Sequence, residues 1–597
     1  MMRRMILAIF LAISVSAFWW LRTEDYEFLR IDDLAYVTEN THVQGGLTVP
    51  NISWAFANVN QGNNWHPLTW TSLMLDASLA SEKSLPTFSR VMHRHNAILQ
   101  GISAAFLFLL MTMLAARILG TNSTGRGSHG VTLAICICLA LVWALHPLRA
   151  EVVCWVTERK ELLCTVLGLA TMILWLSGRT WLTACAVLLY VAALLSKSVA
   201  VTIPVALIAF DFIGCTDGDW RRVIRRRMAL WGILFAFGAV AAYCTVVSQA
   251  PAIKGNQDTA LWIRIFNGFG AYAVHARSMF FPFGLYFHHP FVDHVEWIPF
   301  AVGMVFMICA VGATWKFFRN RCQGGTYAVI GFLATAWCIV GLTPMCGVLR
   351  VGIEMNPDRF GHWVGAGLTV CIALALLKLL DKASTKVVRC VLAVLLVLVA
   401  ATGVAGWNYG AFFRNNFTLF SRTVACKPDH PQALSHVGSE YAVRFNRPDL
   451  AIECYERSIA AFPSDDVGGQ LATVLATRGN PADFPRVKQL CAAVIKDRTL
   501  DESGLALGAL GMVAMYEHKW DEAASYLRDS AARQKATGKP TEDTWMRVAM
   551  CHYNAKDYAK AKPILSSLAV SRNPAIKAKA IELIGYIMQK ERPSVFR

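Results

Sequence analysis

Long apolar runs constrain this chain more than any other feature, for example MILAIFLAISVSAFWW at residues 5–20 and VLAVLLVLVAATGVAG at residues 391–406. A helix needs ~17–25 mostly apolar residues to cross the hydrocarbon core of a bilayer. Hydrophobic residues make up 55% of the chain and charged residues only 16%, whereas soluble domains carry about 25% charged residues. Lipid must therefore cover part of the molecule, and we expect an all-α, polytopic membrane helix bundle.

We predict about eleven membrane spans from the lengths of these runs. One further segment, 260–283, is apolar but carries Arg264, His275 and Arg277. If this segment crossed the membrane, the basic residues at 316–321 would lie on the outer side, which the positive-inside rule disfavours. We therefore predict an interfacial or re-entrant helix there. The alternative has twelve spans and a C-terminal domain inside. The expected spans lie near 5–21, 96–117, 131–147, 161–177, 181–195, 199–214, 229–249, 297–317, 326–344, 361–379 and 388–407.

Basic residues crowd particular ends of these runs and predict the topology. Arg3 and Arg4 precede the first run, and further clusters lie at 221–227, 316–321 and 378–389. By the positive-inside rule these ends are cytoplasmic, and they account for the net charge of +17 without nucleic acid. We expect an uncleaved N-terminal anchor rather than a secretory signal. The predicted location is a bacterial inner membrane, or the endoplasmic reticulum membrane of a eukaryote.

The charge and hydropathy patterns change near Trp407, which predicts two domains, 1–407 and 408–597. The second part has amphipathic helical periodicity, with small residues at recurring places. The separation is 72 residues from Ala451 to Ala523 and 38 residues from Ala523 to Ala561, roughly two repeats and one repeat of ~34 residues. We therefore predict a tetratricopeptide-repeat α-solenoid, lying periplasmic or lumenal. Its repeats either bind a partner or acceptor polypeptide, or serve only as a spacer.

Two adjacent acids, Asp32 and Asp33, follow the first apolar run. Neighbouring side chains point in different directions, so one could face a substrate while the other holds a neighbour. A carboxylate beside a membrane-embedded donor could act as general base towards an acceptor hydroxyl. The alternative is a pair of solvated loop acids. We take Asp32 and Asp33 as the candidate catalytic residues.

Charged residues also gather between the predicted third and fourth spans, where the positive-inside rule disfavours cations. Arginine or lysine side chains there could hold a phosphate group. The alternative for this segment is a salt-bridged interfacial helix. For Lys197, a lone cation between two apolar runs, the alternative is a side chain that only snorkels to the interface. Arg159 and Lys160 are the candidate phosphate-binding residues of this segment. Lys197 is a further functional candidate, and Arg359 either pairs with Asp358 or contacts a donor phosphate. The candidate supporting residues are His66, His146, Glu151, Glu158 and Asp358.

Metal and nucleotide motifs are missing from the sequence. We find no Cys/His spacing typical of zinc, no Walker sequence and no HExxH motif. We therefore name no metal ligand and no certain cofactor, although a divalent cation remains open.

Several motifs occur in an order that resembles one family. They are Asp32–Asp33 with Tyr36 and Asn40, the Trp65–Trp70 segment (WHPLTW), His146–Pro147–Leu148 with Glu151, Trp155, Glu158, Arg159 and Lys160, Ser196–Lys197 with Thr202 and Pro204, Tyr286 to Pro290, and Asp358–Arg359–Phe360. Together with the C-terminal repeats, they resemble the transmembrane and tetratricopeptide-repeat O-mannosyltransferases and their bacterial relatives. The resemblance covers nearly the whole chain.

This resemblance implies a membrane glycosyltransferase of the GT-C class. The family uses a polyprenyl- or dolichyl-phosphate sugar donor, acts on the outer or lumenal face and inverts the anomeric carbon. Its eukaryotic members transfer mannose to protein Ser/Thr hydroxyls. The resemblance assigns the base to Asp32 or Asp33, and it makes Arg159, Lys160, Lys197 and Arg359 candidates for the lipid-phosphate end. Arg149 in place of a second His, and Glu161 in place of a common Asp, are departures that concern the donor sugar.

Three function classes remain for comparison. The first is the glycosyltransferase, which needs a lipid-linked sugar donor and an acceptor. The second is a non-catalytic membrane scaffold whose repeats bind a partner. The third is a transporter or a polysaccharide polymerase or ligase, although transporters place ionisable residues at mid-membrane, whereas here they lie at the ends of the apolar runs.

Overall fold

The computed structural model describes residues 2–59, 64–80, 82, 84–120, 126–215, 219–255, 259–320, 325–349, 354–496, 504–536 and 541–591. Every secondary-structure element in these ranges is a helix. The chain divides into two compact units, Met1–Leu419 and Phe420–Arg597. This division lies after Leu419, beyond the boundary at Trp407 that the composition predicts, and each unit is described by itself.

The first unit contains the helices that are long and apolar enough to cross a membrane. Within the described residues there are seven, or eight if the bent pair His129–Leu145 and Pro147–Cys154 forms one span. The seven are Met2–Thr23 (α1), Leu85–Leu119 (α5), Trp220–Ala250 (in α11), Trp297–Arg319 (α13), Gly325–Met345 (α14 to η7), Asp358–Leu379 (η8 and α16) and Thr385–Arg414 (α17 and η9).

The other three predicted spans fall on helices that do not meet the length and composition of a membrane span, so the structure does not confirm the count of eleven. The expected spans 181–195 and 199–214 fall on two shorter apolar helices, Thr180–Leu194 and Ser198–Ile213. The span expected at 161–177 falls on α8 (Arg159–Leu176), whose first turn is charged. The segment 260–283 forms α12 (Leu261–Phe280), which is not among the candidate spans.

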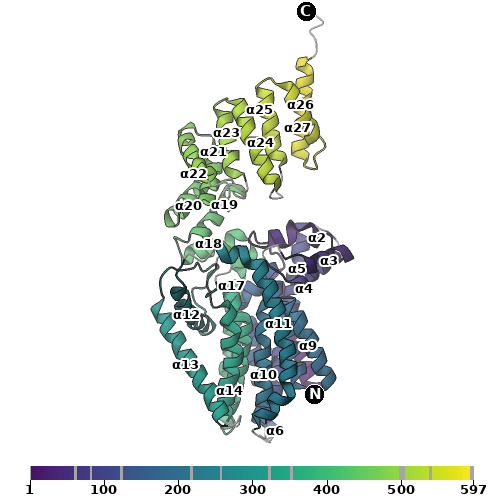
Figure 1. Ribbon diagram of the computed structural model, residues 1–597, viewed down its shortest axis with the longest axis vertical. Coiled ribbons are helices and arrows are strands. Elements are labelled where there is room, and N and C mark those ends of the chain that lie inside the picture. Colours follow the sequence, from purple (N-terminus) through teal and green to yellow (C-terminus); the bar gives the residue numbers. More distant parts are fainter. Residues whose placement is uncertain are drawn as a thin grey trace, which may run out of the picture. The chain divides into compact units, whose positions relative to one another are not determined.

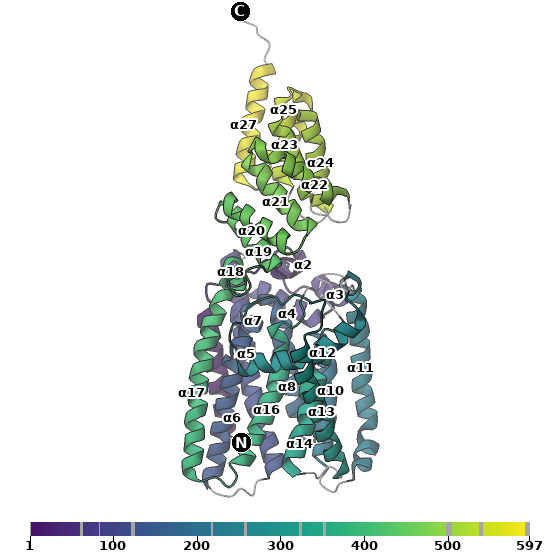
Figure 2. The ribbon, with the colours of Figure 1, turned by 90° about the vertical axis from the view of Figure 1, so that its left-hand side faces the viewer.

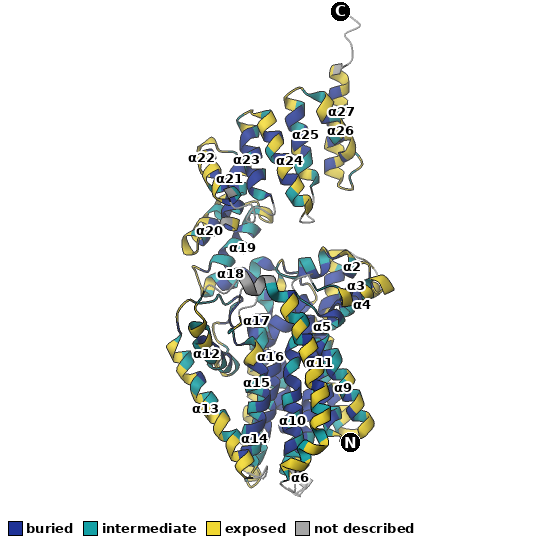
Figure 3. Cartoon of the chain, viewed as in Figure 1, coloured by how far each residue is buried: buried dark blue, intermediate teal, exposed yellow. Residues whose placement is uncertain are grey.

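Some of these helices expose apolar side chains that only lipid could cover. Along α13, Ile298 is 80% exposed, and Val397 of α17 is 67% exposed. Figure 3 shows exposed residues along most of α13, whereas α10 and α16 are largely buried. A soluble protein rarely exposes apolar patches of this extent, so the structure supports a membrane protein.

The basic clusters predicted to share one side lie at one end of the first unit, here called the basic end. Arg4 and Lys378 line a common cavity with Leu119 at the end of α5. Nearby, Arg117 of α5 donates to the Leu176 carbonyl, and Arg227 pairs with Asp211. The described residues of the four clusters belong to helix ends and turns that Figure 1 shows at the bottom of the view, and Arg321 lies outside the described residues.

The loop end, which carries residues 24–59, 64–80 and 146–158, is the opposite end of the same helices. Tyr26 donates its hydroxyl to the carbonyl of Gly410 at 2.7 Å, so α1 and α17 both end there. Figure 2 shows the short helices α2, α3, α4 and α7 gathered at this end. The short elements are η1 (Leu34–Thr38), α2 (Thr41–Gln44), α3 (Val49–Ala57), α4 (Pro67–Leu79), η3 (Pro147–Arg149), α7 (Ala150–Cys154) and η4 (Val156–Glu158).

The remaining helices of the first unit complete the bundle. They are α6 (Arg126–Leu145), α9 (Thr180–Leu194), η5 (Ser198–Thr202), α10 (Ile203–Ile213), α11 (Trp220–Gly255), α14 (Gly325–Ala334), η6 (Thr335–Ile339), α15 (Val340–Leu342), η7 (Thr343–Met345), η8 (Asp358–Phe360), α16 (Gly361–Leu379), α17 (Thr385–Gly410) and η9 (Ala411–Arg414).

Successive helices in the second unit pack on one another. Their buried faces form cores around Leu471 and Val487, around Leu527 and Val548, and around Leu565 and Leu583. A connecting helix, α18 (Asn416–Cys426), spans the division between the units. It is followed by α19 (Pro431–Val443), α20 (Pro448–Ala461), α21 (Asp465–Arg478), η10 (Pro481–Asp483), α22 (Phe484–Lys496), α23 (Leu505–Tyr516), α24 (Trp520–Ala536), α25 (Glu542–Asn554), α26 (Tyr558–Leu568) and α27 (Pro574–Glu591).

Candidate functional site

The two adjacent acids lie at the loop end and have different surroundings. Asp33 is fully buried and accepts hydrogen bonds from the Leu29 amide at 2.8 Å, the Thr157 amide at 3.0 Å and the Thr157 hydroxyl. Asp33 thus joins the loop after α1 to the segment before α8. Asp32 keeps 43% of its side chain exposed, and one carboxylate oxygen lies 3.9 Å from Nζ of Lys160.

Burial also changes the acidity of Asp33. Removal from water raises the pKa of its carboxyl to about 7, and the hydrogen bonds from Thr157 and Leu29 only partly oppose this effect. Asp33 is therefore an interior tether between two segments. Of the two acids, Asp32 is the one that solvent or a substrate can reach.

The segment after α6 turns sharply and carries charged residues inwards. His146 caps η3 by accepting from the Leu148 amide, and Pro147 occupies the first position of that turn. The axis bends by 56° between α6 and the residues that follow. As a result Glu151, Glu158 and the first turn of α8 are buried at the loop end.

Three cations converge on the carboxylate of Glu158. Nζ of Lys160 lies 3.1 Å from Oε1, Nζ of Lys197 lies 3.4 Å from Oε2, and Nε of Arg359 lies 3.4 Å from Oε1. They come from α8, from the residue before η5 and from η8. Burial disfavours the charged carboxylate, but the three cations outweigh it and hold the pKa of Glu158 well below its usual range.

Further acids surround the same three cations. Lys197 pairs with Glu161 at 2.7 Å, and Arg359 pairs with Glu151 and Glu354. Burial raises the pKa of Glu354. We call the whole group the Glu158 cluster, consisting of Asp32, Glu151, Glu158, Lys160, Glu161, Lys197, Glu354 and Arg359.

Carboxylates outnumber cations in this cluster, so every cation already has partners. An incoming anion must therefore exchange with a carboxylate or arrive as one of the acids takes up a proton. The most replaceable partner is Asp32, because it is exposed and its contact with Lys160 is the longest.

Aromatic rings cover the cations. Lys160 lies over the rings of Tyr36 and Trp155, at 5.2 and 5.6 Å from their centroids. Arg359 lies over Trp155 and Phe360, at 5.4 and 5.5 Å. Ring faces attract cations and exclude water. The exclusion of water strengthens the ion pairs between these cations and the carboxylates of the Glu158 cluster.

His66 lies beside these rings. It is buried, its ring is 5.4 Å from that of Tyr36 and 5.3 Å from that of Trp70, and its Nε2 has no hydrogen-bond partner in the described part of the chain. Burial, reinforced by Lys160 and Lys197, lowers the pKa of His66 well below its usual value. The ring is therefore neutral.

Arg159 is separate from the Glu158 cluster, although it precedes Lys160 in the chain. Its guanidinium contacts Asp76 at 2.8 Å, Asn96, the Ser72 hydroxyl and the Met92 carbonyl. With only 1% of its side chain exposed, it joins α8 to α4 and α5. Adjacent helix positions face different directions, which separates the two cations.

The other predicted residues are distributed around the cluster. Glu151 and Glu158 belong to it, whereas His146 acts as a cap and Asp358 is buried on η8 beside Arg359. Glu161 and Glu354 were not among the candidate residues. The spacing of Glu161, three residues after Glu158, could have indicated a shared face. Glu354 lies in the same short charged stretch as Asp358 and Arg359, which indicated its proximity to them but not its pairing with Arg359.

A metal site receives no support from the geometry. Within the described residues no group of three His, Cys, Asp or Glu side chains is placed to hold a metal ion. Comparison of the sequence with protein-family models and with curated proteins finds no match.

Proposed function

We propose that this chain is an integral-membrane, inverting glycosyltransferase. It moves a mannose-like sugar from a polyprenyl-phosphate donor to an acceptor hydroxyl. The observation that carries the proposal is the exposed Asp32 carboxylate 3.9 Å from Lys160, itself part of a buried group of three cations. A base beside a phosphate-binding group is what such a transfer requires.

In the proposed reaction Asp32 takes the proton of the acceptor hydroxyl. The hydroxyl oxygen then forms a bond to the anomeric carbon, while the bond from that carbon to the phosphate oxygen breaks. Lys160, Lys197 and Arg359 neutralise the lipid phosphate that leaves. Asp33 holds the loop that carries Asp32, and Arg159 takes no part.

The proposal includes the membrane topology predicted from the sequence. The chain has eleven spans, and α12 lies at the interface. The N-terminus and the basic end are cytoplasmic, as the positive-inside rule predicts, and the loop end lies outside. The helical pairs of the second unit are proposed to be tetratricopeptide repeats that present a polypeptide with Ser/Thr hydroxyls. The membrane is a bacterial inner membrane, or that of the endoplasmic reticulum.

The test compares Asp32→Asn with a matched variant, Asp25→Asn. Asp25 is also exposed at the loop end, where it pairs with Arg414. Each full-length protein is assayed in membranes for transfer from polyprenyl-phosphate mannose to a Ser/Thr-rich peptide. We expect Asp32→Asn to lower kcat by about 10²–10⁴-fold and Asp25→Asn to leave it unchanged.

Full activity of Asp32→Asn would remove the base assignment. If the native protein neither binds nor uses any polyprenyl-phosphate sugar, the glycosyltransferase proposal fails and the membrane scaffold becomes the better account.

A further inference from the structure

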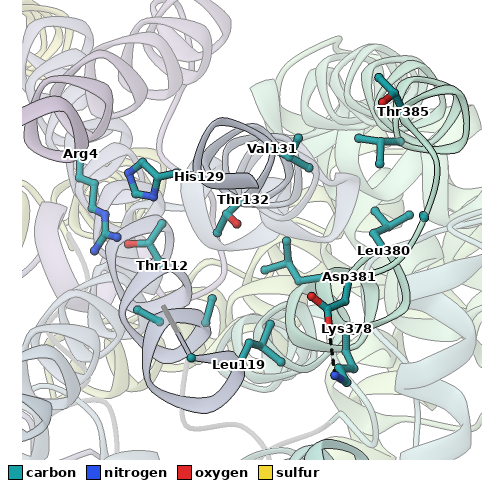
Figure 4. Close-up of a pocket in the computed structure, with 16 residues that line it drawn as sticks. Arg4, Thr112, Leu119, His129, Val131, Thr132, Lys378, Leu380, Asp381 and Thr385 are labelled. Carbon is teal, nitrogen blue, oxygen red and sulfur yellow. Dashed lines mark hydrogen bonds and ion pairs between the residues drawn. The ribbon is translucent and has the colours of Figure 1, made fainter. Parts of the chain in front are cut away.

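A cavity of about 580 Å³ lies at the basic end of the first unit, away from the Glu158 cluster. Its walls come from α1, α5, α6, α16 and α17 and from the turn after α16. A space of this size accommodates a small molecule or the head of a lipid. Figure 4 shows its polar lining, with Arg4, His129 and Thr112 on one side of the view and Lys378 and Asp381 on the other.

The cavity has the charge of an anion site. Lys378 pairs with Asp381 at 3.2 Å, but this pair is exposed and therefore weak. Arg4 has no carboxylate partner in the part of the chain that the structure describes, and His129 adds two ring nitrogens. Lys382, Lys386 and Arg389 lie in the same turn and helix start, so the surrounding potential is positive.

Helix direction reinforces this charge. Arg4 lies in the first turn of α1, His129 near the start of α6 and Thr385 at the start of α17, and all three line the cavity. The start of a helix carries unpaired amide groups and a partial positive charge. Three such helix starts around one cavity favour an anion, although the ends of α5 and α16 oppose them.

Besides three threonines, the remaining lining is mostly apolar and lies between the helices of the first unit. Ala115, Leu119, Leu377 and Val388 line the same cavity as the charged groups. α6 packs against both α16 and α17, while those two helices are joined by a short turn at this end. A ligand here meets cations and apolar side chains together at the ends of these helices, which are the surroundings of a lipid headgroup.

We propose that this cavity binds an anionic glycerophospholipid from the leaflet at the basic end. Its headgroup lies between Arg4 and His129 on one side and Lys378 on the other, and its glycerol and first methylene groups lie against Ala115, Leu119 and Val388. The bound lipid joins the ends of α1, α5, α6, α16 and α17. This site is independent of the proposed transfer reaction.

The experiment measures lipid binding to the purified full chain by native mass spectrometry, with phosphatidylglycerol and phosphatidylcholine titrated separately. We expect phosphatidylglycerol to bind more tightly. Arg4→Gln and Lys378→Gln should each weaken its binding about fivefold, the effect of one basic residue near a lipid surface. Arg3→Gln is the matched control, because Arg3 is the exposed neighbour that does not line the cavity.

Each outcome decides the proposal. Equal binding of the two lipids, or equal loss in Arg3→Gln and Arg4→Gln, overturns it by indicating a general surface charge effect. Competition by inorganic phosphate would overturn the lipid assignment in favour of a free-phosphate site. Selective loss in Arg4→Gln and Lys378→Gln, with no competition by phosphate, supports it. Lys378 is exposed at a helix end, so its variant remains informative if Arg4→Gln folds poorly.

Discussion

Neighbouring residues at the loop end have opposite environments, and this contrast gives them different roles in the proposed reaction. Asp32 is exposed and lies near Lys160, whereas Asp33 is buried and holds the Thr157 segment. Likewise Lys160 faces the Glu158 cluster while Arg159 is enclosed between helices. One member of each pair can meet a ligand, and the other supports the structure around it.

The raised pKa of Asp33 predicts a pH-dependent stability. The folded protein keeps this carboxyl protonated up to about pH 7, whereas an unfolded chain releases the proton near pH 3.8. Between these values the folded state binds more protons, so stability falls as the pH rises through the window. Asparagine does not titrate, and Asp33→Asn should show a smaller fall in Tm between pH 4.5 and pH 8.

The measurement is thermal unfolding in detergent at both pH values, with Asp25→Asn as the control that keeps the native fall. Asp33→Asn should also have a lower Tm at either pH, because its amide cannot accept bonds from both Leu29 and Thr157. The same pH dependence in Asp33→Asn and the native protein would contradict the assignment.

Replacing Arg159 by lysine should affect stability, whereas replacing Arg359 by lysine should affect binding of the proposed polyprenyl-phosphate donor. Arg159 donates through all three guanidinium nitrogens to buried partners, and lysine cannot reproduce this fork. Arg159→Lys should therefore cost about 1–3 kcal/mol of stability and leave the donor KM unchanged. Arg359→Lys should raise the donor KM severalfold. Donor titrations of both variants, scaled to folded protein, check this, and a raised KM in Arg159→Lys would refute the division.

At the scale of elements, close helix packing at the loop end depends on single glycines. A Cβ at Gly406 of α17 would lie 2.1 Å from the Leu145 carbonyl oxygen at the end of α6. At Gly403, one turn earlier, the nearest atom would be a Leu145 methyl at 3.6 Å, an ordinary contact. α17 can therefore approach α6 closely only at Gly406, and this approach positions the segment from His146 onwards.

Alanine substitution should accordingly have opposite effects at the two glycines. Gly403→Ala should be neutral or stabilising by about 0.5–1 kcal/mol, because alanine favours helix. Gly406→Ala should cost about 1–3 kcal/mol through overpacking against the carbonyl. Thermal unfolding of the two variants in one detergent tests the difference, and equal Tm values would show that the helices can separate without cost.

At the scale of the whole molecule, the basic clusters share one end and the candidate site occupies the other. With a cytoplasmic basic end, the last helix of the first unit ends outside, beside Tyr26. An alkaline phosphatase fusion at the C-terminus should then be active in a bacterial host, and a green fluorescent protein fusion dark. The reverse result would favour twelve spans, with 260–283 as a crossing.

The sequence by itself determined the features that depend on composition and local periodicity. Apolar runs predict membrane helices because hydrocarbon tolerates no unpaired backbone, and basic run ends predict one common side, which the structure has. Sequence patterns also indicated five residues of the Glu158 cluster as candidates, namely Asp32, Glu158, Lys160, Lys197 and Arg359. The count of crossings was less accessible, because α8 combines a charged first turn with an apolar remainder.

Only the tertiary structure decided which of these side chains meet. Lys197 and Arg359 reach Glu158 from distant parts of the chain, and the direction of each side chain depends on how α8, η5 and η8 pack. The same packing turned Arg159 away and buried Asp33 against Thr157. Adjacent residues differ by about 100° around a helix, so their sequence proximity does not indicate a common environment. The packing of distant segments sets that environment.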